Sequence, residues 1–267
     1  MLQNRSRRTI QVTSQGRHGM QELAHWWRRL TSRSARQAWG LAPHGMAWAL
    51  VGLTRQSHGL AKVHTSVSLQ APTGFGFADL AWLSQALRHN GRLRGGARHR
   101  LNMALPAAHL QEGVIDFPAQ MPQEDWVYEV QLEVSQALQL SPDEVNFDFE
   151  PAPLTDGLVQ RVHWIGCAQA HMVDFKDCTR AAGWRLAAVE SEAQAAQRGV
   201  RALQGGVSSL LTQAPQDWQF RLATPTGLTG EGSPDSDDAI DEAIRQVLST
   251  PTGSRLVASG LALKAWQ

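Results

Sequence analysis

Two histidines and two cysteines lie close together in the middle of the chain, and both residue types bind zinc. They are His163, Cys167, His171 and Cys178. Structural zinc sites commonly pair their ligands as Cys-x-x-Cys or His-x-x-x-His, and this spacing lacks that pairing. On a strand, His163 and Cys167 would share one face with Ile165, which favours packing. We therefore expect no metal site, and two cysteines without a disulfide framework indicate a reducing compartment.

Other segments resemble parts of ligand sites without completing them. Gly74–Asp79 reads GFGFAD, like part of a dinucleotide loop, but it lacks the third glycine and is expected to be a turn before a helix. An acidic run lacks the ligand spacing of a calcium loop and is expected to supply charge to the start of a helix at 239–248. That run is Asp235, Asp237, Asp238, Asp241 and Glu242. No serine lies in a nucleophile-elbow context. We predict no catalytic residue, no cofactor and no metal.

Charge is distributed unevenly along a chain whose overall composition is that of a soluble globular protein. Of 267 residues, 42% are hydrophobic and 18% charged, with a net charge of +1. Residues 1–78 contain ten Lys or Arg and a single acidic residue, Glu22. Such asymmetry indicates orientation against an acidic partner or an anionic membrane. A second basic run at 88–100 has no interleaved aromatic residues, so nucleic-acid binding is not expected.

Residues 1–37 are rich in Arg and Ser and are expected to form a basic, disordered tail. The alternative is a short amphipathic helix at Glu22–Leu30, with Trp26, Trp27 and Leu30 on one side and arginines beside them. Such a helix would lie on an anionic bilayer. No apolar run is long enough to span a membrane, and no secretory signal is present, so a cytoplasmic protein is expected.

Hydrophobic periodicity predicts alternating strands and helices from residue 38 onward. Strands are expected within 39–53 (two, joined by a turn at 43–45), 61–69, 101–105, 113–118, 143–149, 162–168 and 186–189. Helices are expected at 78–89, 123–140, 172–182, 239–248 and 256–266. Gly183 is expected to end its helix in a left-handed turn. The stretch 224–238 has the composition of a loop or linker.

Several of these segments, in this order, carry a resemblance to a known family. They include GVIDFP at 113–118, the Glu-containing helix at 123–140, DEVNFDF at 143–149 and GWRLAAVESEA at 183–193. Taken together, they resemble PilM, the actin-like protein of type IV pilus assembly. The resemblance covers about 39–200, and the closing helix near 256–266 is similar to the last helix of that family. It departs at Leu138–Leu140, where other residues form the turn in PilM.

The resemblance implies an α/β fold: an actin-like, ribonuclease-H-like lobe with an inserted α+β subdomain and a second lobe that is reduced or absent. The first subdomain would comprise 38–112, with a return at 183–204 and the C-terminal helix at 251–267. The inserted subdomain would comprise 113–182, and 205–250 would be a linker or a remnant of the second lobe.

The resemblance also identifies where a nucleotide would bind. Actin-like ATPases hold phosphate at a hairpin of the form Asp-x-Gly-Ser/Thr-x-Ser/Thr. In this chain Ala42 replaces the Asp, Pro43 removes an N–H, and Met46 and Trp48 replace hydroxyl residues. We therefore expect a non-enzymatic protein that binds no nucleotide. The alternative is an actin-like ATP-binding protein with a diverged site.

The function that the resemblance implies is a cytoplasmic scaffold of type IV pilus assembly, or of a related competence or secretion system, at the inner face of the inner membrane. Its partner would be the N-terminal tail of a PilN-like inner-membrane protein, bound between the first and inserted subdomains. Residues expected to contact that peptide are Ile115, Phe117, Glu133, Asn146 and Asp148. The basic N-terminal part would help to hold the complex against the anionic inner leaflet.

Overall fold

A computed structural model describes residues 36–72, 80–92, 99–152, 159–222 and 235–266. The described residues leave out most of the expected tail, with the helix at Glu22–Leu30, and the expected turn at 74–79. They also leave out residues 93–98 of the basic run and residues 224–234 of the expected linker stretch. None of the helices in the described ranges is long and apolar enough to cross a membrane.

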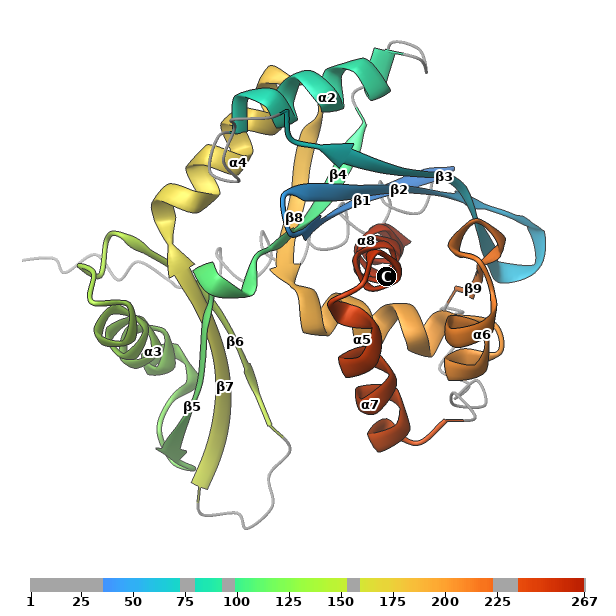
Figure 1. The fold of residues 1–267 in the computed structure, drawn as a ribbon. Helices are drawn as coiled ribbons and strands as arrows, with labels where there is room; N and C mark the ends of the chain where they lie inside the picture. Colours follow the sequence, from blue (N-terminus) through green and yellow to red (C-terminus); the bar gives the residue numbers. More distant parts are fainter. Residues whose placement is uncertain (1–35, 73–79, 93–98, 153–158, 223–234, 267) are drawn as a thin grey trace, which may run out of the picture.

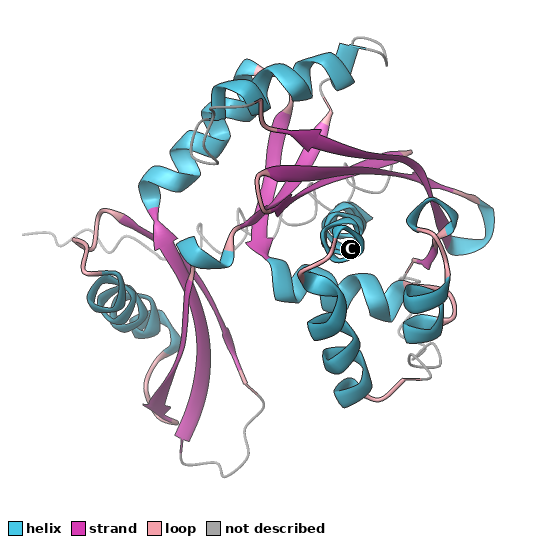
Figure 2. Cartoon of the chain, in the orientation of Figure 1, coloured by secondary structure: helices cyan, strands magenta, loops and turns pink. Residues whose placement is uncertain are grey.

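The described strands fall into two separate sheets (Figure 1, Figure 2). The large sheet has six strands in the order β8-β4-β1-β2-β3-β9, and the small sheet has three in the order β5-β7-β6. The strands are β1 (Gln37–His44), β2 (Ala47–Arg55), β3 (Leu60–Gln70), β4 (Arg100–Leu105), β5 (Gln111–Pro118), β6 (Val145–Pro151), β7 (Val159–Ala168), β8 (Arg185–Ser191) and β9 (Gln219–Arg221).

Helices cover both faces of the large sheet and one face of the small sheet (Figure 1). They are α2 (Leu80–Arg92), α3 (Gln123–Leu138), α4 (Gln169–Ala181), α5 (Glu192–Ala202), α6 (Gly206–Thr212), α7 (Asp237–Leu248) and α8 (Pro251–Leu263). Short 3-10 turns include η2 (Ala107–His109), which connects β4 to β5. The expected strands and helices are confirmed wherever the structure describes them.

Alternation along β1 divides the large domain into two cores. Trp39 and Leu41 face one core, which includes Trp48 and is covered by α2 and α4. Ala38 and Ala42 face the other core, which contains most of α8. Small residues on this second face let α8 lie close to the strand, since a Cβ at Gly40 would come within 1.9 Å of the carbonyl oxygen of Ala258. β1 is therefore the central strand, buried on both faces.

The segment 205–250 is not a linker where the structure describes it. Trp218 and Phe220 are fully buried, and β9 extends the large sheet by pairing with β3. Ile240 and Ile244 of α7 belong to the same core as α8. Aromatic and branched side chains spaced along a polar stretch are enough to dock it, because each buried side chain contributes about 1.5–3 kcal/mol. Whether this segment is a remnant of a second lobe stays a prediction.

Helix ends follow their sequence signals. Ser191 accepts a hydrogen bond from the N–H of Gln194 at the start of α5, and Ser236 and Thr250 cap α7 and α8 in the same way. Gly183 adopts φ +83° after α4, which confirms the expected left-handed turn. That turn brings the chain back into the large sheet as β8.

Candidate functional site

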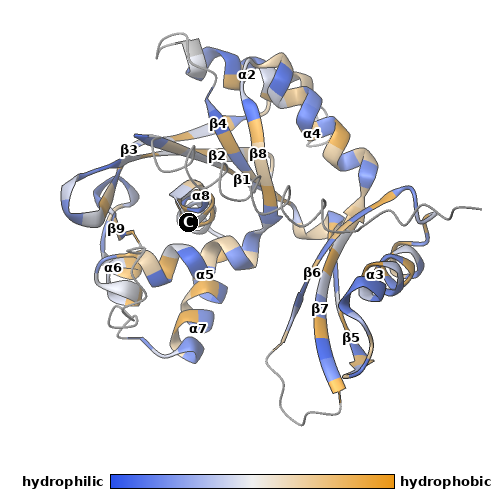
Figure 3. Cartoon of the chain, turned by 180° about the vertical axis from the view of Figure 1, so that it is seen from behind, coloured by the Kyte–Doolittle hydropathy of each residue, from blue (hydrophilic) through white to orange (hydrophobic). Residues whose placement is uncertain are grey.

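The small sheet has one covered face and one open face. Helix α3 packs on the covered face through Trp126, Val130 and Val134. Figures 1 and 3 both show α3 on the outer side of this sheet, with α5 and α7 on the opposite side. The open face therefore looks towards the large domain.

The strand register assigns side chains to the open face. Side chains alternate along a strand, and residues opposite one another in a pair share a face. In β7, Val162 and Trp164 belong to the core under α3, so their neighbours point the other way. Figure 3 shows both hydrophilic and hydrophobic bands along β7. The open face is formed by Glu112, Val114 and Asp116 of β5, Arg161, His163 and Ile165 of β7, and Asn146, Asp148 and Glu150 of β6.

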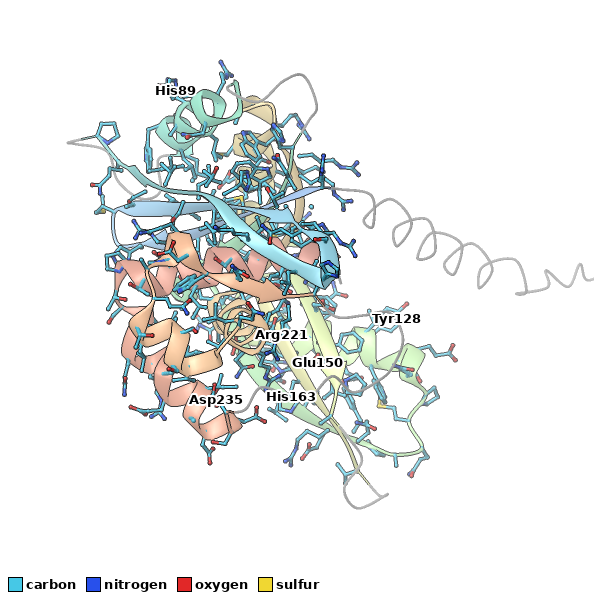
Figure 4. The ribbon with its side chains drawn as sticks, turned by 90° about the vertical axis from the view of Figure 1, so that its right-hand side faces the viewer. His89, Tyr128, Glu150, His163, Arg221 and Asp235 are labelled. Carbon is cyan, nitrogen blue, oxygen red and sulfur yellow. The ribbon has the colours of Figure 1, made fainter. Side chains whose placement is uncertain are left out.

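Charge on the open face is mainly negative. Arg161 is the one Lys or Arg in the three strands, and its Nε and Nη2 bond both carboxylate oxygens of Asp116 at 2.9 and 3.0 Å. The hydrogen bonds and the charge of Arg161 lower the pKa of Asp116. Glu150 lies opposite His163 (Figure 4). On its other side, His163 lies opposite Val114 in the strand register. The face thus combines carboxylates with apolar side chains, a surface that suits an extended, basic peptide.

The five residues that sequence reasoning assigned to a peptide site do not form one surface. Phe117 is 4% exposed and stacks on Trp126, with ring centroids 5.6 Å apart. Ile115 packs against the same core, and Glu133 lies half-buried on α3 itself. Asn146 and Asp148 lie on the open face, so the sheet separates them from Ile115 and Phe117. Only Asn146 and Asp148 remain candidates for this face.

Sequence reasoning missed Glu112, Glu150 and His163 as members of the open face. The alternation within each strand was visible, but it does not say which set of side chains the helix covers. The sequence predicts His163 only as a packing residue, with a zinc ligand as the alternative. It does share a face with Ile165 and Cys167, as expected, and it is exposed whereas Cys167 is buried.

The cysteines are packing residues. Burial raises the pKa of the Cys167 thiol, against a hydrogen bond with Asn146, and raises the pKa of the Cys178 thiol to about 11. Metals bind the thiolate, which burial disfavours. Across the described parts of the chain, no three His, Cys, Asp or Glu side chains are grouped as metal ligands.

The expected phosphate hairpin is the β1–β2 hairpin, and most of its side chains belong to the core, whereas Met46 in the turn is exposed. Ala42 and Trp48 are buried, and Trp48 contacts Phe175 edge to face with ring centroids 6.0 Å apart. Gly45 forms the turn between the two strands, with a φ of +54°. Positions that hold hydroxyl groups in phosphate-binding hairpins therefore serve packing or the turn.

Two short connections join the small sheet to the large domain. The chain enters through η2 after β4 and leaves through the first turn of α4 after β7. His109 of η2 and His171 of α4 bring these connections together, with ring centroids 4.4 Å apart. The Glu192 carboxylate, at the start of α5, bonds the backbone N–H of Ala107 in η2. These contacts hold the small sheet, and with it the open face, against the large domain.

The His109–His171 contact predicts a dependence of stability on pH. Burial and the charge of His109 lower the pKa of His171 below 6.5, although Asp174 opposes this. The unfolded chain therefore binds a proton at higher pH than the folded chain, so stability is full above about 6.5 and falls as the pH drops below it. Thermal unfolding between pH 5 and 8 should show a shallower loss for His171→Gln than for the unchanged protein. His89→Gln, at an exposed histidine on α2, should leave the profile unchanged.

Comparison with known proteins supports the fold. No family model matches the chain, and no curated protein matches its sequence. Among solved structures, it is similar to a PilM-PilN type IV pilus biogenesis complex, with a TM-score of 0.52, 21% identity and coverage of 64% of this chain and 51% of the other. The chain thus spans about half the length of that structure.

Two further structures share less of the fold. The cytoplasmic domain of EpsL, an inner membrane component of the type II secretion system of Vibrio cholerae, matches with a TM-score of 0.39 at 13% identity, covering 60% of this chain and 56% of that one. A Bacteroides thetaiotaomicron protein with an actin-like ATPase fold and unknown function matches with a TM-score of 0.35 at 8% identity, covering 63% and 56%. The similarity to the PilM-PilN structure and the two sheets with their helices confirm the predicted α/β fold, and the division into a first and an inserted subdomain stays a prediction.

Proposed function

We propose that this chain is a non-enzymatic scaffold of a type IV pilus or a related competence or secretion machine. Its open face would bind the cytoplasmic N-terminal tail of a PilN-like protein. The inner-membrane partner would place the chain at the inner face of that membrane. Support comes from the similarity in fold to a protein solved in complex with PilN.

The observation that carries this proposal is the composition of the open face. An extended peptide presents alternate side chains to a surface, so apolar and charged residues at two-residue spacing are what it can contact. Glu112 and Asp148 lie on either side of Ile165 in one row, and Val114 and Glu150 lie on either side of His163 in the next. A partner tail with Lys or Arg among apolar residues matches these rows in charge.

Two exposed carboxylates provide a test of the contact. Asp148 and Glu150 lie two residues apart on β6, on the same face. The double variant Asp148→Lys/Glu150→Lys should weaken binding of a labelled peptide from the N-terminus of the PilN-like protein of the same genome. We expect a loss of at least about tenfold, because like charges then oppose the basic tail. Fluorescence anisotropy measures the affinity.

The matched control is Glu124→Lys, which reverses an exposed carboxylate on α3, on the other side of the sheet. It should leave peptide affinity unchanged. Equal losses in both variants would indicate general electrostatic attraction, and an absence of binding by the unchanged protein would remove the proposal. A shift of the melting temperature with Mg-ATP would instead favour an actin-like nucleotide-binding protein.

A further inference from the structure

Charge is segregated in this chain far beyond what its net charge of +1 suggests. Residues 111–168, which form the small sheet and α3, contain eleven of the 24 acidic residues and one of the 25 Lys and Arg, a net charge of −10. The rest of the chain therefore carries +11. Residues 1–36 alone have eight Arg and one acidic residue, Glu22, a net charge of +7. The two most strongly charged regions are thus of opposite sign.

Helix α3 exposes apolar side chains in the middle of the acidic region. One side of α3 is buried against the small sheet. On the outer side, Tyr128 is 73% exposed and Leu132 is 48% exposed, and Val127 beside them is 42% exposed. Tyr128 and Leu132 are four residues apart and so are neighbours on the helix surface. Tyr128 is labelled on α3 in Figure 4.

Carboxylates surround this apolar pair, and no basic residue occurs in α3. Glu124, Asp125 and Glu129 lie within one turn of Tyr128 or Leu132. A solvated helix surface would not need two large apolar side chains at its centre. An apolar pair ringed by acids has the composition of a surface that receives a basic amphipathic helix. We name Val127, Tyr128 and Leu132, with the acids around them, the α3 outer face.

We propose that the α3 outer face binds the basic segment 22–33 of a second copy of this chain. The sequence of that segment predicts an amphipathic helix with Trp26, Trp27 and Leu30 on one side. Arg28, Arg29 and Arg33 accompany them. Tryptophan and leucine would pack on Tyr128 and Leu132, and the arginines would face the carboxylates of α3. The segment supplies the positive charges that α3 lacks, and the α3 outer face supplies the negative charges that pair with them.

The distance along the chain assigns the segment to a neighbouring copy. β1 runs parallel to β4 with Trp39 beside Leu101, so Gln37 lies level with the start of β4. The small sheet follows the other end of β4, after Leu105. Residues 34–36 span at most about 11 Å, whereas the eight residues of β1 alone run about 26 Å. A bound segment therefore cannot reach the α3 outer face of its own copy.

Such a contact joins two different surfaces of the same protein, so two copies can exchange their segments reciprocally or further copies can add in a row. The association is electrostatic in large part and should weaken as salt rises. The contact uses neither the open face of the small sheet nor its peptide. It is therefore independent of the proposed function.

Sedimentation velocity of the full chain tests the proposal. The weight-average sedimentation coefficient should rise with protein concentration at low salt and fall towards that of the monomer at high salt. Tyr128→Glu/Leu132→Glu should remain monomeric over the same range. Leu211→Glu, at an exposed leucine on α6, is the matched control and should associate like the unchanged protein. Thermal unfolding confirms that each variant is folded.

A labelled synthetic peptide of residues 20–36 gives a second readout. It should bind the full chain, and binding should weaken by at least about tenfold in Tyr128→Glu/Leu132→Glu. A peptide with Ser at both Trp26 and Trp27 should not bind. Three results would overturn the proposal: a monomer at every concentration, association that the double variant leaves unchanged, or a peptide that binds anionic vesicles and not the protein.

Discussion

Replacing Glu190 with alanine is expected to lower the free energy of unfolding by about 3–5 kcal/mol, because it leaves two cations without their partner in a largely buried place. Glu190 is the residue before the last in β8 and its side chain is 6% exposed, and the side chain of Arg198 in α5 is 17% exposed. Arg198 donates to both carboxylate oxygens, at 2.6 and 2.8 Å, and Lys264 after α8 donates to one of them. One carboxylate therefore ties together three elements of the large domain.

The pKa of Glu190 agrees with this role. Burial alone would raise it, but hydrogen bonds from Arg198 and Lys264 hold the pKa below its ordinary value of 4.5. The stabilisation is thus full above that pH and is lost as the pH falls through the lowered value.

Urea unfolding measures the change, with an unaltered m value as the sign that only stability has changed. Asp116→Ala, in the exposed pair with Arg161, should have a much smaller effect because solvent screens that pair. Glu190→Leu/Arg198→Met, which removes one cation with the carboxylate, should recover part of the loss. A Glu190→Ala protein no less stable than Asp116→Ala would contradict this account.

Replacing Gly260 with alanine is expected to cost about 3 kcal/mol or more, the upper end of what overpacking costs. A Cβ at Gly260 would lie 1.8 Å from the carbonyl oxygen of Ala195 in α5. The atom that blocks it is backbone, so no side-chain rotation relieves the clash. α5 and α8 would have to move apart, and α8 also lies against β1 at Gly40.

Gly45→Ala is the control, because a Cβ at Gly45 meets nothing within 4 Å. Its φ of +54° makes the substitution cost about 1 kcal/mol through backbone strain alone. Thermal and urea unfolding compare the two variants. Equal losses would mean that α8 does not pack as closely as the structure has it.

Local signals sufficed for most of the fold. Alternation predicted the strands, helical spacing predicted α3 and α4, and Gly183 marked the end of α4. These signals depend only on residues that are close in the sequence, so they can be recognised without knowledge of the tertiary structure. The order of the segments then indicated the actin-like arrangement.

In the region after residue 200, local sequence patterns no longer predict the structure. β9 has three residues, too few for a periodic pattern, and its pairing with β3 joins residues far apart in the chain. Trp218 and Phe220 are apolar residues in a polar stretch, and their packing partners come from β3, α5 and α8, which are distant in the sequence. The sequence therefore left open whether 205–250 is a linker or a remnant of a second lobe, and its described parts are packed against the large sheet.

Only part of the candidate site could be predicted, because the register between neighbouring strands decides which side chains share a face. Ile115 and Phe117 share one face of β5, and Asn146 and Asp148 share one face of β6, but the expectation that all four line one groove needs these two faces to coincide. The pairing of both strands with β7 decides which faces coincide, and a shift of one residue exchanges them. That pairing is not visible in either strand alone.

The central claim is that the open face of the small sheet binds the tail of a PilN-like protein, and hydrogen exchange measured by mass spectrometry tests it most directly. The full chain is compared with and without a peptide from that tail. A bound extended segment should slow exchange in β5, β6 and β7 and leave α2 and α3 unchanged. Protection confined to elements other than these strands, or no protection at saturating peptide, would contradict the account.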